Sequence, residues 1–200
     1  MYIHKNRKFL YVHVQKTGGS FFKRLFRKKQ LGRIGDKHCK VHDIHNEISN
    51  EYNDFYIFGM VRNPYSRLAS AYRFNKDKRI LALRKQVVNL DLNNPMKCDV
   101  EDFITWYDKC GCMVQSKYFY KDHPRQIIGK YEQLNSYIKD IFEKVDLPYK
   151  YAKRNHKTLY FGQYSIRDYL TNRAIEMINN ICDEDFKRFG YKKVQFINEL

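Results

Sequence analysis

The 200-residue sequence contains no apolar run long enough to span a bilayer, and no hydrophobic leader follows Met1. Its five cysteines are an odd number, which excludes a complete internal set of disulfides. No internal repeat, low-complexity segment or linker divides the chain. We therefore expect a soluble, cytoplasmic protein with reduced thiols. Its length suits a single domain over residues 1–200 with a buried hydrophobic core.

Acidic residues are scarce, because 22 Asp and Glu stand against 38 Lys and Arg, which gives a net charge of +16. Such a charge predicts an anionic partner but not its kind, which can be nucleic acid, an acidic glycan or a phosphorylated nucleotide. Basic residues crowd the first quarter of the chain, where a solvated helix face and an acceptor-binding surface are both open interpretations. No recognised nucleic-acid-binding motif is present, so a partner of that class is not expected.

A hydrophobic strand, a glycine loop and a helix follow one another near the N-terminus. Residues 9–14 (FLYVHV) predict a buried strand, and an amphipathic helix begins near Ser20. The loop between them, QKTGGS at 15–20, combines a cation, two hydroxyls and two glycines that let backbone N–H groups approach an anion. It is not a Walker A loop, because its lysine precedes the glycines. The loop predicts a phosphate site, with an ordinary strand-to-helix turn as the alternative.

A second predicted strand ends in an arginine. Residues 54–61 predict a buried strand, which Arg62, Asn63 and Pro64 follow. Pro64 suits the first position of a helix with Asn63 as its cap, and Ser70 lies two turns further on. Arg62 and Ser70 can therefore reach one anion. A metal-dependent nucleotide enzyme would be expected to have an acidic residue at this strand end, so the arginine predicts phosphate binding without a metal.

Strands alternate with helices along the chain, which indicates an α/β domain with a small, mostly parallel sheet flanked by helices. Residues 126–129 predict a third strand, and residues 1–7 read as a polar lead-in. Ligands bind such sheets at the carboxyl ends of the strands, where both motifs lie. The expected helices cover residues 42–52, 64–74, 77–92, 99–109, 132–145 and 171–189.

The two motifs, in this order, resemble the 5′-phosphosulfate loop and the 3′-phosphate motif of sulfotransferases that use 3′-phosphoadenosine 5′-phosphosulfate (PAPS). Later landmarks of the membrane-type carbohydrate sulfotransferases recur as DFI at 102–104, Gln115, YF at 118–119, IGKYEQL at 128–134 and DFKRFGY at 185–191. The resemblance implies a P-loop-like sulfotransferase fold, PAPS as donor and 3′-phosphoadenosine 5′-phosphate (PAP) as product, without a metal. The family usually has Pro where Gln15 stands. Its animal members carry a membrane anchor and a longer body, so the resemblance leaves the acceptor and the compartment open.

The resemblance also implies the residues of the site. Its donor contacts map onto Lys16, Thr17, Gly18, Gly19, Ser20, Phe21, Arg62, Ser70, Arg154 and Lys157. Lys16 would stabilise the charge that builds on the leaving phosphate. His42 is the preferred base for the acceptor hydroxyl, with His45 and His38 as alternatives between the two motifs. A zinc site formed by the three histidines with Cys39 is a further alternative.

The expected reaction is in-line transfer of a sulfuryl group from PAPS to a hydroxyl of a carbohydrate, with an anionic glycan as one candidate acceptor. The alternatives are a different P-loop phosphotransferase and a basic module that binds nucleic acid or other polyanions. Gln115 and Glu132 match family landmarks, but their roles do not follow from the sequence.

Overall fold

The structure is a computed structural model that describes residues 1–25, 31–76, 99–147 and 165–200. The described residues form two compact units, each with its own hydrophobic core. The sheet unit contains residues 1–63 and 115–147, and the helical unit contains residues 64–114 and 165–200, apart from the gaps just given. The single domain expected over the whole chain stays a prediction.

The sheet unit is built on five strands in the order β3-β1-β2-β4-β5. β2, β4 and β5 are parallel, whereas β1 pairs antiparallel with β2 and with β3. The predicted α/β class is confirmed, and the predicted strands form the parallel part of the sheet. The strands are β1 (Tyr2–His4), β2 (Phe9–Val12), β3 (Gly32–Arg33), β4 (Tyr56–Val61) and β5 (Gln126–Lys130).

The first strand, β1, corrects the polar lead-in expected at residues 1–7. Tyr2 pairs with Tyr11 and Ile3 with Leu10, so the segment is buried against β2. Its polar appearance comes from the short 3-10 turn η1 (Lys5–Arg7), which returns the chain into β2. Three residues are too few to show a periodic pattern, and their burial depends on strands that come later in the chain.

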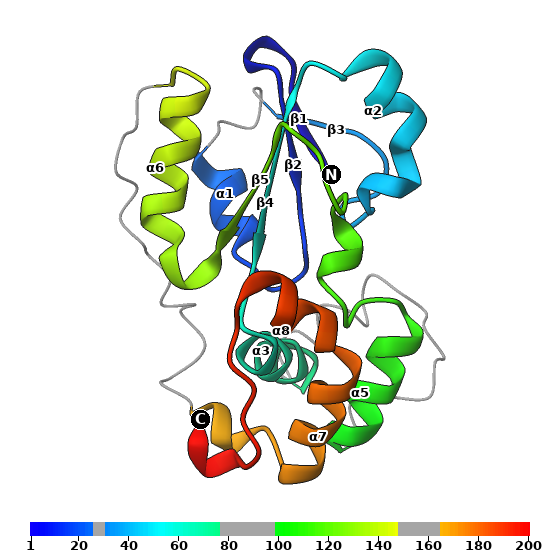
Figure 1. Cartoon of the computed structure of the whole chain (residues 1–200), viewed down its shortest axis with the longest axis vertical. Coiled ribbons are helices and arrows are strands. Elements are labelled where there is room, and N and C mark those ends of the chain that lie inside the picture. The colour runs from blue at the N-terminus through cyan, green and yellow to red at the C-terminus, as the bar shows by residue number, and fades with distance from the viewer. Residues whose placement is uncertain (26–30, 77–98, 148–164) are drawn as a thin grey trace. The chain divides into compact units, whose positions relative to one another are not determined.

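Helices cover both faces of the sheet, α1 and α6 on one face and α2 on the other (Figure 1). Phe22 of α1 stacks on Tyr11 of β2 with ring centroids 3.6 Å apart. On the opposite face the ring of Phe119 lies against Gly59 and leaves no room for a side chain there. The helical elements of this unit are α1 (Gly19–Leu25), η2 (Val41–Ile44), α2 (His45–Glu51), η3 (Ser116–Tyr118), η4 (Tyr131–Gln133) and α6 (Leu134–Lys144).

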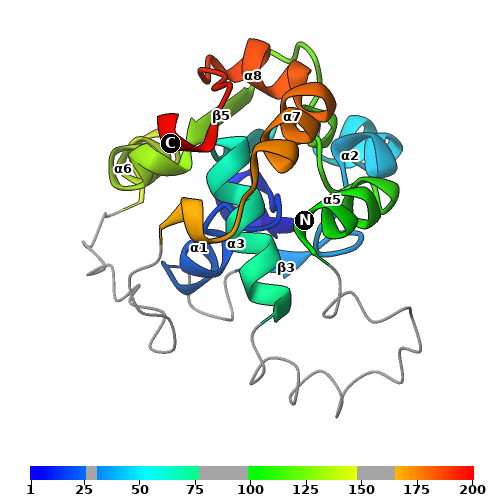
Figure 2. The ribbon, with the colours of Figure 1, turned by 90° about the horizontal axis from the view of Figure 1, so that it is seen from below.

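In the helical unit α5 lies beside α7, and α3 contacts both (Figure 1, Figure 2). The apolar stripe of the expected helix at 64–74, which includes Tyr65, Leu68 and Tyr72, is buried in this core. The helix expected at 64–74 is therefore confirmed. The elements of this unit are α3 (Pro64–Lys76), α5 (Val100–Lys109), η5 (Ile166–Asp168), α7 (Asn172–Ile181), α8 (Asp183–Phe189) and η6 (Ile197–Glu199).

The single helix expected over residues 171–189 is wrong, because two helices occupy that range. α7 ends before Cys182, whose φ of −97° and ψ of 20° interrupt the helix, and α8 starts at the next residue. The first turn of α8 holds the acidic residues 183–185, where negative charge stabilises a helix start. Gly190 ends α8 with a φ of 61°, the left-handed conformation in which glycine commonly stops a helix.

Arg67 is buried in the helical unit, although sequence analysis did not single it out. Its guanidinium donates two hydrogen bonds of 3.1 Å to the carbonyl of Cys112 and another to the carbonyl of Met113. These bonds replace the water that a buried cation loses, and they tie the segment after α5 to α3. Among the described cysteines no disulfide is formed.

Two predictions fall outside the described residues: the charged helix at 77–92 and the basic loop that contains Arg154 and Lys157. The η2 and α2 segment, the α5 helix and the α6 helix lie where helices were expected. None of the helices in the part of the chain described here is both long and apolar enough to cross a membrane.

Candidate functional site

The phosphate loop, residues 15–20, follows β2 at the carboxyl end of the parallel strands. Lys16 and Gly18 have φ values of 66° and 85°, which bend the loop sharply and which lysine adopts far less readily than glycine. Thr17 is buried, and its hydroxyl donates to the carbonyl of Val14 at 2.9 Å. This hydrogen bond closes the loop from within, and it uses the one proton that the Thr17 hydroxyl can donate.

The start of α1 leaves several backbone N–H groups open. The carbonyl of Gly18 accepts hydrogen bonds from the N–H groups of Phe21 at 2.8 Å and Phe22 at 3.1 Å. Within the described ranges, the N–H groups of Gly18, Gly19 and Ser20 have no hydrogen-bond acceptor. Adjacent N–H groups of this kind are ready to bind an anion. The side chain of Phe21 is buried in the core of the sheet unit, and the expected contact of this residue with the donor stays a prediction.

His13, which sequence analysis did not place in the site, fixes the path of the loop. A Cβ at Gly19 would come within 1.9 Å of its ring, so only glycine fits there. Burial, followed by the nearby charges of His38 and Lys37, lowers the pKa of His13 to about 2. The ring is therefore neutral at physiological pH. A polar residue inside an apolar strand pattern was the available signal for it.

Arg62 follows β4, the strand next to β2, and reaches the phosphate loop. Its Nη1 donates to the carbonyl of Lys16 at 3.4 Å, and its guanidinium lies 4.6 Å from the centroid of the Tyr131 ring. The same ring lies 3.0 Å from the position that a Cβ at Gly18 would take. Tyr131 therefore contacts both motifs, which meet within the sheet unit.

The two side chains of unknown role hold the backbone of the second motif. Gln115 is fully buried, accepts from the N–H of Arg62 at 2.9 Å and donates to the carbonyl of the same residue at 2.8 Å. Glu132 accepts from the N–H of Asn63 at 2.9 Å. Strand pairing of β4 with β5 ends at Val61, so these bonds take its place at the next two residues. We infer that both side chains position Arg62.

The histidines expected near the acceptor fall into two groups. His38 Nδ1 lies 2.7 Å from the carbonyl oxygen of His13, and the two rings are 4.5 Å apart. Since a carbonyl only accepts, Nδ1 carries the proton and Nε2 of the neutral ring is an acceptor. Burial lowers the pKa of His38, which favours that neutral form. His42 and His45 instead contact Tyr120, His42 edge-on at 5.1 Å and His45 through Nδ1 at 2.8 Å from the hydroxyl.

Other parts of the predicted site stay open. Ser70 lies on α3 in the helical unit, so its meeting with Arg62 stays a prediction, as do the donor contacts of Arg154 and Lys157 outside the described residues. For the zinc alternative, no three His, Cys, Asp or Glu side chains of the described residues form a group that could hold a metal ion.

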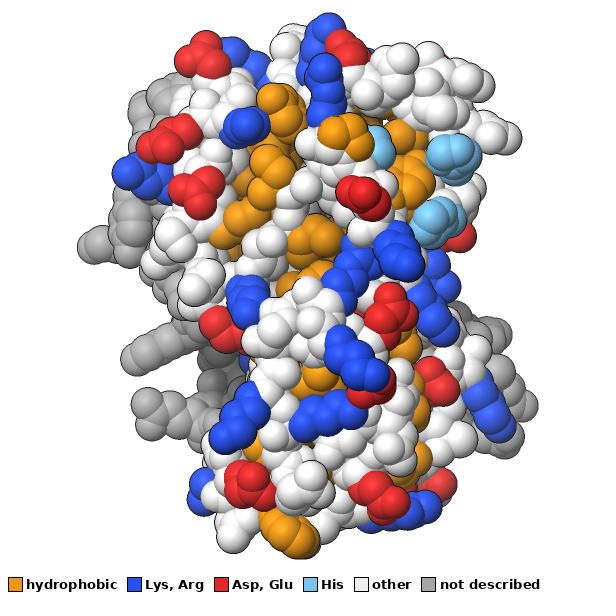
Figure 3. All heavy atoms as spheres, viewed as in Figure 1, with side chains coloured by type: hydrophobic (Ala, Val, Ile, Leu, Met, Phe, Trp, Pro, Cys, Tyr) orange, Lys and Arg blue, Asp and Glu red, His pale blue; other side chains and the backbone are white. Residues whose placement is uncertain are grey.

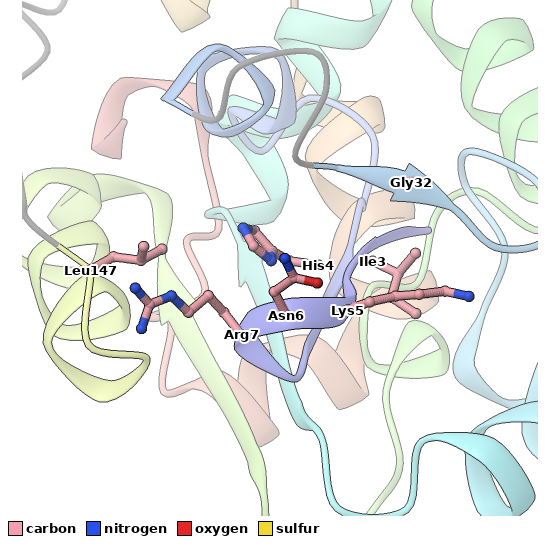
Figure 4. A pocket seen from close by; sticks show the side chains of 7 residues that line it. All are labelled: Ile3, His4, Lys5, Asn6, Arg7, Gly32 and Leu147. Atoms are coloured by element: carbon pink, nitrogen blue, oxygen red, sulfur yellow. The ribbon is translucent and has the colours of Figure 1, made fainter.

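A hollow of about 430 Å³ opens at the other end of β2 (Figure 4). It is lined by β1, the η1 turn, Gly32 and Leu147. In Figure 4, Lys5 and Arg7 extend to opposite sides of the turn, and Arg7 reaches toward Leu147. Arg7 also pairs with Asp146 at 3.4 Å. Because this hollow precedes β2 while the phosphate loop follows it, the hollow does not belong to the site.

Comparison with known proteins agrees with the geometry of the two motifs. The model of the Sulfotransferase family matches residues 1–192, a range that includes the sheet unit, most of the helical unit and both motifs. A search of curated proteins and a search of solved structures found no match. Since the family model matches nearly the entire chain, the chain belongs to the sulfotransferase family, whose members are enzymes that transfer a sulfuryl group, generally from PAPS.

Proposed function

We propose that this sulfotransferase takes the sulfuryl group from PAPS and transfers it to a hydroxyl group of a carbohydrate. One observation carries the proposal: Arg62 Nη1 donates a hydrogen bond to the carbonyl of Lys16, so the two motifs are in direct contact. The phosphate loop then binds the 5′-phosphosulfate and Arg62 binds the 3′-phosphate. Ser70, Arg154 and Lys157 are proposed as further contacts with the donor.

The proposed chemistry breaks the bond between sulfur and the bridging oxygen of PAPS and forms a bond between sulfur and the acceptor oxygen. Negative charge then builds on the 5′-phosphate of the leaving PAP. Lys16 and the open N–H groups of the loop stabilise that charge as it develops. Because these groups supply the positive charge, we expect turnover without a divalent cation.

The acceptor hydroxyl needs a base that is neutral at physiological pH and has an acceptor nitrogen. His38 contacts His13, which follows β2 and lies against Gly19 of the phosphate loop, so we propose it ahead of His42. His45 is the third candidate, although its Nδ1 is engaged with Tyr120. Replacing the base with alanine should lower turnover by about 10²-fold or more and leave PAP affinity unchanged.

The histidine variants His38→Ala and His42→Ala decide between the two assignments. Each is assayed for turnover with sulfur-labelled PAPS and for PAP affinity by calorimetry. Loss of turnover in His42→Ala alone would restore the assignment made from the sequence. Loss in neither variant would remove both residues from the base role.

The reaction itself is tested with sulfur-labelled PAPS and a panel of neutral and acidic glycans, in the presence of a metal chelator. Label that appears in a glycan supports the proposal and names the acceptor. PAP binding is measured separately by calorimetry. A protein that binds PAP but labels no glycan would contradict the carbohydrate acceptor, and one that shows no heat with PAP would contradict the donor.

A further inference from the structure

A basic hollow lies beside the phosphate loop in the sheet unit. Its volume is about 390 Å³, and the described residues that line it are Tyr2, Ser20, Lys23, Arg24, Arg33 and Lys37. These residues come from β1, from both ends of α1, from the end of β3 and from the segment after it. Ser20 belongs both to the hollow and to the phosphate loop, so the two sites adjoin.

The basic hollow and Arg62 lie on opposite sides of β2. In the strand order β3-β1-β2-β4-β5, Tyr2 is on β1 and Arg33 is on β3, whereas Arg62 follows β4. A donor that reaches from the phosphate loop to Arg62 therefore extends away from the hollow. The hollow is left for the second substrate.

The charge of the basic hollow is of one sign. Four of its described lining residues are cations, and none of those described is acidic. Lys23, Arg33 and Lys37 form no ion pair with a carboxylate of the described residues. On the face shown in Figure 3, by contrast, Lys and Arg side chains are mixed with Asp and Glu. Cations that repel one another in a hollow are stabilised by a bound anion.

The basic hollow is also connected to the proposed base. The ring of Tyr2, which lines the hollow, stacks on the ring of His13 with centroids 5.8 Å apart. The ring of His13 in turn lies 4.5 Å from the ring of His38. An acceptor anchored in the hollow would therefore have its neighbouring hydroxyls close to His38 and to Ser20 of the loop.

We propose that the basic hollow binds an anionic group of the acceptor, a carboxylate or a sulfate ester, so that the enzyme selects acidic carbohydrates over neutral ones. The inference rests on the proposed function, since it takes PAPS as donor and a carbohydrate hydroxyl as acceptor. The cations are exposed, so the interaction weakens as salt concentration rises.

The test measures binding to the PAP-saturated protein by calorimetry. The probes are an unsulfated chondroitin hexasaccharide, its carboxyl-reduced form, and a carboxyl-reduced form that carries sulfate. The variant R33Q/K37Q removes two charges from the hollow, and K109Q/K192Q removes two exposed charges from the helical unit as a matched control. PAP affinity is measured for every protein.

The wild type should bind at least one acidic probe about tenfold more tightly than the neutral one, and R33Q/K37Q should lose that preference. K109Q/K192Q should keep it, and PAP affinity should stay within about twofold throughout. The acidic probe that binds identifies carboxylate or sulfate as the ligand.

Three results would overturn the proposal. Equal losses in both double variants would show an effect of overall charge. Weaker PAP binding in R33Q/K37Q would assign the hollow to the donor. A wild-type protein that binds PAP but prefers neither acidic probe would reject the hollow alone, whereas a protein that does not bind PAP would reject the donor assignment on which the inference rests.

Discussion

The two sides of β2 differ in how firmly their cations are held. On the β4 side, Gln115 holds the backbone of Arg62, and Lys16 and Tyr131 contact its guanidinium. On the β1 and β3 side, the lysines and arginines of the basic hollow are exposed. A side chain already held in place loses little entropy on binding, whereas an exposed cation must be ordered by its ligand. We therefore expect large effects of substitution on the first side and smaller, salt-dependent effects on the second.

Lys16→Ala should cause the largest loss, because it removes the cation proposed to meet the leaving phosphate. Turnover with sulfur-labelled PAPS should fall about 10²–10³-fold. The melting temperature should hold, since alanine meets the same restriction at the φ of 66° as lysine does. Lys23→Ala in the basic hollow is the matched control, and it should raise the KM for an acidic acceptor rather than lower kcat. Equal losses of kcat would erase the distinction between the two sides.

Arg62→Ala should have the next largest effect, and it should act on nucleotide binding. The loss of a positioned guanidinium should weaken PAP binding by about 2–4 kcal/mol, measured by calorimetry. Arg33→Ala removes the same charge from the opposite side of β2 and should leave PAP affinity nearly unchanged. If Arg33→Ala weakened PAP binding as much as Arg62→Ala, the donor would extend across both sides.

Gln115→Ala tests whether the two hydrogen bonds between Gln115 and the backbone of Arg62 matter for binding. The substitution leaves the N–H and carbonyl of Arg62 without their described partner, which should lower the free energy of unfolding by about 1–3 kcal/mol in urea. PAP binding should weaken by less than in Arg62→Ala, because the guanidinium remains but is less well positioned. Gln133→Ala, at an exposed position in η4, is the control. A less stable protein with unchanged PAP affinity would show a purely structural role.

Much of the fold could be predicted from local pattern. β2, β4, β5, α3, α5 and α6 all lie at or within about two residues of the expected ranges, because each has enough residues to show its periodicity. β1 could not be found this way, since pairing with β2 and β3 is what buries it. The break at Cys182 was missed because the apolar pattern continues through it, although the acidic run at 183–185 was a signal for a second helix start.

The site could be predicted only where it is local. Lys16 and Arg62 stand in strand-loop-helix patterns, so their residue types and positions indicated an anion site. Gln115 and Glu132 reach the second motif across 53 and 69 residues, a distance over which a single sequence shows no pattern. The contact of His38 with the backbone of His13 could not be predicted for the same reason, since it joins residues that lie 25 positions apart in the sequence.

The smallest expected effect concerns His13. This residue follows β2 and contacts Gly19 of the phosphate loop and Tyr2 of the basic hollow. Below pH about 6.5 this histidine takes up a proton in the unfolded chain, whereas in the folded chain it stays neutral down to about pH 2. Its contribution to stability is therefore present above pH 6.5 and falls as the pH falls, with a slope that approaches about 1.4 kcal/mol per pH unit.

Urea unfolding of the wild type and of His13→Gln at about pH 7.5 and pH 5.5 isolates the contribution of His13 to the free energy of unfolding, because every other titrating group is common to both proteins. The wild type should lose about 1 kcal/mol more than the variant on acidification. Equal losses would mean that His13 is protonated in the folded state, and that water reaches the ring that contacts both Gly19 of the phosphate loop and Tyr2 of the basic hollow.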